Sequence, residues 1–177
     1  MYELIPDELK QLKQWVCWKG EPDPARPGKI KKMPINPKTG GKAQSNNPDT
    51  WTDYPTAVKA SRKHSGIGLM LGGGFFGVDI DDIDDAISDF KAGGIDNIVS
   101  EFVYSLESYA EYSQSGKGLH IICKGTLPEG GRRKGNVEMY QSGRFFIMTG
   151  QAAAEFGDVA DCTESIKMLH AKYIGNP

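Results

Sequence analysis

Apolar and polar residues alternate along the chain in short segments that predict both helices and strands. Apolar residues at helical spacing, several behind a capping residue, predict helices over residues 6–14, 52–64, 84–90, 96–106 and 163–173. Apolar or alternating runs bounded by glycine and polar residues predict strands over 15–19, 66–71, 75–80, 108–113, 118–123, 136–140 and 144–149. Three glycines at 72–74 predict a hairpin between the second and third of these strands. Helices flanking mostly antiparallel strands make α+β the expected fold class.

The remaining sequence suggests one domain with a long irregular segment. Residues 20–50 are rich in Pro, Gly, Lys and Asn, and we expect a functional or mobile loop there. We expect a single domain over 1–177, with an N-terminal part to about 70, a core over about 71–150 and a closing helix over about 161–173. The last four residues, "IGNP", are linker-like, so we expect a piece cut from a longer protein.

Composition indicates an ordinary cytoplasmic domain. The 177 residues are 38% hydrophobic, which is enough for a core, and no run of about 18 apolar residues predicts a membrane span. The N-terminus lacks the basic and apolar regions of a secretory signal. Three cysteines, far apart and odd in number, argue against a disulfide framework or a CxxC zinc site.

The net charge of -2 conceals separate basic and acidic regions. Six cations and no acid lie between Arg26 and Lys42, and a second basic cluster begins at Arg132. Six aspartates lie between Asp79 and Asp89. The plain interpretation of either run is a solvated loop, and the alternative is a pair of surfaces for charged ligands.

Asp79 and Asp81 flank Ile80 at the end of a predicted strand. Because strand side chains alternate, the two carboxylates share one face while Val78 and Ile80 point into the core. Neighbouring carboxylates repel each other, and a divalent cation such as Mg²⁺ or Mn²⁺ removes that cost. The alternative is a polar strand end whose aspartates cap the helix that follows.

The stretch "SQSGKGLHI" predicts a flexible turn that could hold phosphate. Its hydroxyls, backbone N–H groups and one ammonium come from Ser113, Ser115, Gly116 and Lys117, and such concave turns bind phosphate oxygens. His120 follows on the next strand, where a histidine alone is more often structural. The stretch is not a P-loop, because it lacks GxxxxGK[ST] and lies between two strands.

Two further residues could complete the same site. Glu138 is a lone acid in the predicted strand "NVEMY", and it is either an edge residue or a third carboxylate of a two-metal site for phosphoryl transfer. Arg144 begins the strand "RFFIMT". If that strand pairs with "NVEMY", Arg144 reaches the same cleft and grips a phosphate; otherwise it is an ordinary surface arginine.

Taken in order, "GVDIDDI", "SQSGKGLHI" and "NVEMY" resemble the three motifs of the archaeo-eukaryotic primase superfamily: a hydrophobic DxD, an SxH-like motif and a later acid. The surrounding "YAEYSQSGKGLHI" and "VEMYQSGRFFIMTG" are similar to the primase-polymerases of phages and mobile elements in particular. "WVCWK", "KKMPINPKTG" and "NPDTW" resemble their N-terminal part, so the resemblance spans about residues 15–150. No zinc motif is present and no helicase ATPase follows, unlike in many relatives.

The resemblance implies an RRM-like catalytic sheet joined to an α/β N-terminal part. It implies that Asp79, Asp81 and Glu138 bind two Mg²⁺ or Mn²⁺ ions and that His120 contacts the phosphates of a dNTP or NTP. We expect the other nucleotide-binding residues to be Ser113, Ser115, Gly116, Lys117 and Arg144. We expect the residues that bind DNA phosphates to be Lys29, Lys31, Lys32, Arg132 and Arg133.

The expected activity is template-directed nucleotidyl transfer by a DNA polymerase or primase in phage or mobile-element replication. Its expected partners are a single-stranded DNA template, a primer and a helicase domain or subunit, with no membrane. Tyr140 is a candidate for excluding a 2′-hydroxyl. Trp15, Trp18 and Trp51 could stack on bases, although core packing is expected for at least two of them. The alternatives are a metal-dependent nuclease, disfavoured by the phosphate-binding turn, and a non-catalytic single-strand-binding module.

Overall fold

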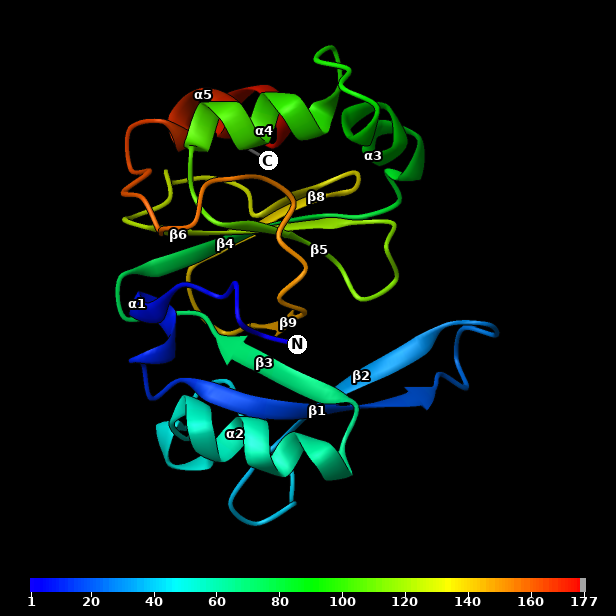
Figure 1. Ribbon diagram of the computed structural model, residues 1–177, viewed down its shortest axis with the longest axis vertical. Helices are drawn as coiled ribbons and strands as arrows, with labels where there is room; N and C mark the ends of the chain where they lie inside the picture. The colour runs from blue at the N-terminus through cyan, green and yellow to red at the C-terminus, as the bar shows by residue number, and fades with distance from the viewer. Residues whose placement is uncertain (176–177) are drawn as a thin grey trace.

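The computed structural model describes residues 1–175 and contains two antiparallel sheets stacked on each other (Figure 1). The first sheet has the order β2-β1-β3-β9 and consists of β1 (Trp15–Pro22), β2 (Ile30–Ile35), β3 (Gly66–Met70) and β9 (Phe145–Met148). The second has the order β5-β6-β4-β8-β7 and consists of β4 (Phe75–Ile80), β5 (Ala110–Tyr112), β6 (Leu119–Lys124), β7 (Arg133–Lys134) and β8 (Val137–Tyr140). The α+β class expected from the sequence is confirmed.

Most of the helices cover the outer faces of the two sheets, while the short first helix packs Leu9 into the core between them. The helices are α1 (Asp7–Lys10), α2 (Tyr54–Ala60), α3 (Asp84–Lys91), α4 (Ile98–Leu106) and α5 (Ile166–Tyr173), with 3-10 turns η1 (Pro48–Thr50) and η2 (Ser61–Lys63). In Figure 1, α3, α4 and α5 lie above the five-stranded sheet and α2 lies below the four-stranded one. No helix within residues 1–175 combines the length and apolar character needed to cross a membrane.

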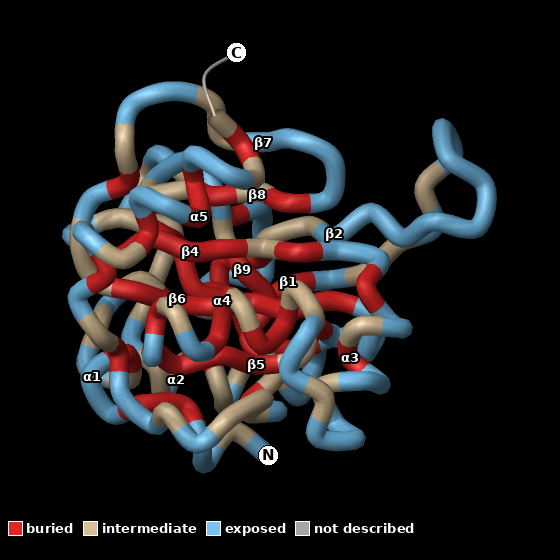
Figure 2. The backbone as a smooth tube through the Cα atoms, turned by 90° about the horizontal axis from the view of Figure 1, so that it is seen from above, coloured by how far each residue is buried: buried red, intermediate tan, exposed pale blue. Residues whose placement is uncertain are grey.

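Two main hydrophobic clusters hold these layers together, and Figure 2 shows that the buried backbone follows the strands. Val78 and Ile80 belong to the cluster between the five-stranded sheet and the upper helices. Ile122 and Phe146 belong to the cluster that joins the two sheets. Because strand residues alternate, Asp79 points away from the first cluster, toward the four-stranded sheet.

The hairpin predicted at the three glycines is wrong. β3 pairs with β1 and β9, while β4 pairs with β6 and β8 in the other sheet. Each strand has a partner on both of its edges, and both strands are almost wholly buried. Between them, a single bridge joins Gly72 and Phe75. The strand "RFFIMT" does not pair with "NVEMY", the arrangement considered for Arg144, since β9 pairs with β3.

Residues 20–50 are not one irregular loop. β1 extends to Pro22 and pairs with β2 in a hairpin that protrudes from the body of the molecule (Figures 1 and 2). The sequence of β2, "IKKMPI", is mostly exposed and carries two lysines and a proline, so it gives no apolar alternation. A buried loop residue, Asn36, follows the strand.

The predicted helices are present, but several begin or end at other residues than predicted. The first ends at Lys10, because the chain must extend into the buried strand that starts at Trp15. Asp53 caps α2, its Oδ1 accepting from the N–H of Thr56 (2.8 Å), and Asn97 caps α4, its Oδ1 accepting from the N–H of Ser100 (2.8 Å). In the linker-like end "IGNP", Ile174 is buried, and residues 176–177 lie outside the described residues.

Candidate metal and nucleotide site

One row of ionisable residues crosses the five-stranded sheet. In the sheet register Glu111 pairs with His120, His120 with Asp79, Asp79 with Glu138 and Glu138 with Arg133. Residues directly opposite in an antiparallel sheet lie on the same face, so all five side chains belong to one face. That face looks toward the four-stranded sheet.

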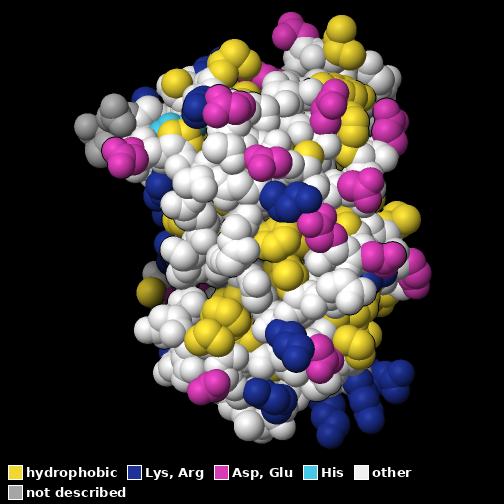
Figure 3. Space-filling model, turned by 90° about the vertical axis from the view of Figure 1, so that its left-hand side faces the viewer, with side chains coloured by type: hydrophobic (Ala, Val, Ile, Leu, Met, Phe, Trp, Pro, Cys, Tyr) yellow, Lys and Arg dark blue, Asp and Glu magenta, His cyan; other side chains and the backbone are white. Residues whose placement is uncertain are grey.

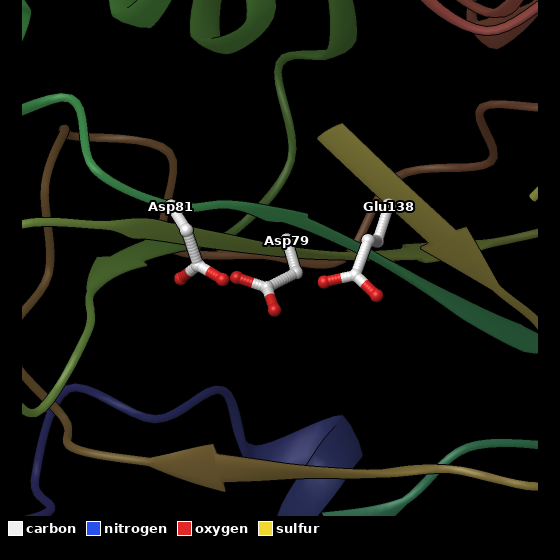
Figure 4. A group of neighbouring side chains, drawn as sticks. All are labelled: Asp79, Asp81 and Glu138. Carbon is white, nitrogen blue, oxygen red and sulfur yellow. The ribbon is translucent and has the colours of Figure 1, made fainter. Parts of the chain in front are cut away.

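The three acids predicted to bind metal come together at the centre of this row. One carboxylate oxygen from each of Asp79, Asp81 and Glu138 lies within 4.8 Å of the others. Figure 4 shows the three side chains pointing the same way, from β4, the residue just after it and β8. Within the described chain, Asp79 Oδ1 is buried and has no hydrogen-bond partner. A buried, unsatisfied carboxylate oxygen beside two more acids fits a divalent cation with hard oxygen ligands.

Backbone hydrogen bonds hold Asp81 in place at one end of the group of three acids. Its N–H donates to the carbonyl of Asn136 (3.0 Å), and the Asn136 amide donates back to its carbonyl (2.8 Å). Asp82 then takes a left-handed conformation with φ of 53°, which ends the strand. Desolvation and the charges of Asp79 and Glu138 raise the pKa of the Asp81 carboxyl, although His120 and Lys32 oppose the shift.

His120 is held on two sides. Its Nδ1 donates to the carbonyl of Ile147 (3.1 Å), its ring packs against Phe146, and its Nε2 lies 3.3 Å from Asp79 Oδ1 without the alignment of a hydrogen bond. Burial alone would lower the pKa of this imidazole, but the neighbouring Asp79 carboxylate outweighs burial and the pKa is raised. The contact with Ile147 fixes the ring orientation from the other sheet.

A recess of about 190 Å³ opens over the acids. It is lined by Lys32, Asp79, His120, Glu138, Tyr140, Arg144, Phe145, Phe146 and Ile147. Arg144 therefore reaches the cleft, although its strand belongs to the other sheet. Its guanidinium lies 4.6 Å from the centre of the Tyr140 ring, and the Tyr140 hydroxyl donates to Glu138 Oε1 (2.7 Å). Burial and then the Glu138 carboxylate raise the pKa of this hydroxyl.

The predicted phosphate-binding turn lies beside Asp81 and does not line the recess. The N–H of Ile83 donates to the carbonyl of Lys117 (2.9 Å), which ties the turn to the acidic stretch. A side chain at Gly118 would meet Ile80 O at 2.9 Å, so only glycine allows this approach. Ser113 is buried against Ser115 (3.2 Å between the two Oγ atoms). Exposed members of the turn are Ser115, Gly116 and Lys117.

The residues predicted to bind DNA divide into three groups. Lys29 and Lys31 are exposed at the protruding hairpin, whereas Lys32 lines the recess over the acids. Arg132 is partly buried, and its Nη1 donates to the carbonyl of Pro128 (2.8 Å). Arg133 lies opposite Glu138, with 3.9 Å between its Nε and Oε1 of the acid.

The tryptophans are mainly core residues, as expected for at least two of them. Trp15 and Trp18 are buried, and the Trp15 indole N–H donates to the carbonyl of Leu9 (2.9 Å). Trp51 is half-buried, and its indole N–H donates to the carbonyl of Gln44 (2.8 Å).

Glu111 is a further member of the site that was not predicted from the sequence. It is fully buried and accepts hydrogen bonds from the Tyr109 hydroxyl (2.8 Å) and from the backbone N–H groups of Thr149 (2.7 Å) and Gly150 (2.9 Å). The sequence feature that could have indicated a buried functional acid is its position between alanine and tyrosine in a short predicted strand. The carboxylate joins β5 to the end of β9, next to the residue that orients His120.

No family model matches the sequence. A curated relative, described as a DNA primase-polymerase from Nitratiruptor phage NrS-1, is 31% identical over 177 aligned residues. The alignment covers 94% of this chain and 22% of the relative, so the chain spans about a fifth of that protein's length. The similarity includes the region of all three motifs that suggested the superfamily. Over nearly its whole length the chain is therefore similar to part of a phage DNA primase-polymerase, which supports its identification as a prim-pol domain.

Proposed function

We propose that this domain transfers nucleotides to a primer on a single-stranded DNA template, as a DNA polymerase or primase in the replication of a phage or mobile element. The observation that carries the proposal is a cluster of three acids at a recess with basic side chains. Asp79 and Glu138 line the recess and Asp81 lies within 4.8 Å of them. The basic side chains that line it are Lys32, His120 and Arg144. The relative's description as a DNA primase-polymerase supports the same activity.

The donor set fits divalent metal ions. Asp79, Asp81 and Glu138 would hold Mg²⁺ or Mn²⁺, since hard carboxylate oxygens and a buried unsatisfied oxygen suit these ions. When bound, such ions activate the attacking 3′-hydroxyl and neutralise charge on the transferred phosphate. Desolvation and then the charge of Asp79 raise the pKa of Asp81, and a cation would relieve both causes.

The cations of the recess would hold the triphosphate of a dNTP or NTP. Lys32, His120 and Arg144 face the acids from β2, β6 and the residue before β9. Arg144 can grip two phosphate oxygens at once, and His120 is already oriented by Ile147. Ser113, Ser115, Gly116 and Lys117 would assist from the turn beside Asp81, with Ser113 acting on the conformation of the turn. A hydrolytic nuclease has no need of this triphosphate site.

The family and the partial coverage also suggest the domain's setting. We propose that residues 1–177 form one catalytic domain, with an N-terminal part to about 70 and a core over about 71–150, within a longer replication protein. The exposed lysines at positions 29 and 31 would contact template phosphates, and Arg133 would do so from the other side of the acids. A helicase domain or subunit as partner rests on the family resemblance.

Primer extension on a primed single-stranded template tests the proposal. We expect extension with Mn²⁺ or Mg²⁺, and we expect Asp79→Ala/Asp81→Ala to lower it at least about 100-fold, because several kcal/mol of charge stabilisation are removed. The matched control is Asp84→Ala/Asp85→Ala, which removes the same charge from exposed residues outside the triad and should retain activity.

Three other outcomes would contradict the proposal. Degradation of the primer would indicate a nuclease. Strand binding without nucleotide binding would indicate a non-catalytic module. Extension that survives the removal of both aspartates would place the metal site elsewhere.

A further inference from the structure

A second concave surface lies on the α2 side of the four-stranded sheet, away from the acids. This recess of about 620 Å³ lies between the loop after β2 and the end of α2 with η2. Its lining residues are Pro37, Lys38, Thr39, Gly40, Thr56, Lys59, Ala60, Arg62, Lys63 and His64. Four of them are Lys or Arg, and none of the lining residues identified within 1–175 is acidic. We refer to it as the α2 recess.

These cations have no acidic partners. Lys59, Arg62 and Lys63 are exposed, and none forms an ion pair with another residue of 1–175. A cation at Lys59, in the last turn of α2, is explained by the helix dipole. Arg62 and Lys63 lie beyond that helix and Lys38 comes from another segment, so the dipole does not account for the cluster.

The charge is also separated on the scale of the molecule. Figure 3 shows Lys and Arg side chains gathered at the lower end, which Figure 1 identifies as the end carrying α2, and more Asp and Glu toward the upper end. A hollow of one sign of charge concentrates ions of the opposite sign. The expected ligand of the α2 recess is therefore an anion.

The loop wall of the α2 recess is already fixed. Asn36 Oδ1 accepts from the N–H of Lys38 (2.9 Å), and its carbonyl accepts from the N–H of Gly40 (2.8 Å). The Lys38 ammonium donates to the carbonyl of Asp49 (2.8 Å). A wall formed before the ligand arrives lowers the ordering cost of binding.

The same loop leads toward the acids. Ile35 and Lys42 pair at its base, and residues 42–46 line another recess of about 490 Å³ that shares Arg144 and Phe145 with the recess over the acids. A single strand of DNA that leaves the acids past Arg144 and Lys42 would therefore reach the loop that carries Lys38. Polyanionic nucleic acid fits this succession of cations better than an isolated anion does.

We propose that the α2 recess binds phosphate groups of single-stranded DNA that extends from the site of the acids. The proposal rests on the proposed function, because it assigns a second region of contact with the same nucleic acid. Lys38, Lys59, Arg62 and Lys63 supply the charge, and Thr39 and Thr56 supply hydroxyl donors beside them.

The test measures binding of labelled oligodeoxythymidylates, short and long, to the whole chain in EDTA over a series of salt concentrations. For the long oligonucleotide, Arg62→Ala/Lys63→Ala should weaken binding roughly tenfold at low salt, as expected for two screened ionic interactions. The slope of log affinity against log salt should become shallower by about 0.7 for each phosphate that the variant no longer neutralises. Binding of the short oligonucleotide should change little.

The matched control is Lys167→Ala/Lys172→Ala, which removes the same charge from α5 at the opposite end of the molecule (Figure 1). If both pairs weaken binding equally, or if the slope does not change, the α2 recess does not bind DNA. If Arg62→Ala/Lys63→Ala abolishes binding of inorganic tripolyphosphate but not of DNA, the ligand is a free phosphate and the proposal fails.

The two proposals can fail separately. The binding assay needs no metal and no catalysis, so a chain that does not extend primers can still show the expected fall in salt dependence. Conversely, extension abolished by Asp79→Ala/Asp81→Ala with DNA binding indifferent to Arg62 and Lys63 would support the catalytic site and overturn the α2 recess.

Discussion

Asp79 has a histidine on one neighbouring strand and an acid on the other. His120 Nε2 lies 3.3 Å from its Oδ1, and Glu138 is its partner in the register of β8. The Asp79 carboxylate raises the pKa of this imidazole, which favours its charged form. Replacement of Asp79 therefore removes a candidate metal ligand and also the carboxylate that raises the pKa of His120.

Tyr140 provides a test of sugar selection at the residue scale. Its ring lies under Arg144 and its hydroxyl is bonded to Glu138, so it forms one wall of the recess. We expect Tyr140→Ala to raise the use of NTP relative to dNTP by roughly tenfold or more, the scale of steric selection for one small group.

The measurement is the ratio of kcat/KM for the two nucleotide types in primer extension. Tyr140→Phe keeps the ring and should keep most of the preference, although it removes the hydrogen bond to Glu138. A ratio that stays the same in the alanine variant would exclude the ring as the selecting group.

Glu111 provides a test at the scale of the elements, because its carboxylate joins β5 to the end of β9. Glu111→Gln replaces one acceptor oxygen with an NH₂ group that only donates, so the backbone N–H of either Thr149 or Gly150 loses its acceptor. We expect the free energy of unfolding to fall by about 1–3 kcal/mol, the usual cost of leaving a buried donor unsatisfied.

Urea unfolding of the Glu111→Gln variant measures this cost. Glu155→Gln makes the same chemical change at an exposed residue and should change stability by no more than about 0.5 kcal/mol. Equal stability of the two variants would show that Glu111 does not join the strands energetically.

Local pattern was sufficient to predict most elements of the core. β4 combines apolar residues with Asp79 on the opposite face, and β8 alternates in the same way, so both strands and their acids could be predicted from the sequence. β2 could not, because exposed lysines leave it without apolar alternation. Its strand conformation comes from pairing with β1, which is a tertiary effect.

Which β-strands pair with each other could not be predicted from the sequence. Leu69 and Phe76 are both buried in apolar strands, and nothing local indicates that those strands belong to different sheets. Arg144 shows the same limit: the pairing considered for its strand does not form, yet the stacking of the sheets brings the residue to the recess of Asp79 and Glu138. Alternation indicated which face of each strand carries Asp79, Asp81 and Glu138, but their clustering also depends on the pairing of β4 with β8, and it was expected only from the resemblance of the three motifs to the superfamily.

At the scale of the whole molecule, a contact between α4 and α5 predicts how stability depends on pH. Lys172 donates to Glu101 Oε1 (2.6 Å), and the Tyr173 hydroxyl donates to Glu101 Oε2. Burial alone would raise the pKa of Glu101, but these hydrogen bonds outweigh burial and lower it. A depressed pKa in the folded state stabilises the fold above the unfolded value of about 4.3, and this contribution disappears as pH falls through the folded pKa.

We therefore expect Glu101→Gln to lower the Tm at neutral pH, with a difference from the native chain that shrinks as pH falls below about 4. Thermal unfolding across this pH range measures the effect. Glu164→Gln, which alters an exposed pair with Lys167, should show little difference at any pH. A difference for Glu101→Gln that is independent of pH would mean that the contact acts by packing alone.

The row of ionisable residues across the five-stranded sheet restricts where residues can be inserted or deleted in the chain. An extra codon between Gly77 and Val78 would turn Val78 and Ile80 to the opposite face and direct Asp79 into the apolar layer under the helices. The same insertion at the exposed tip of the β1–β2 hairpin, around Gly28, would shift no residue of the row. Insertions and deletions in descendants of this sequence should therefore accumulate at that tip and be purged from β4, β6 and β8.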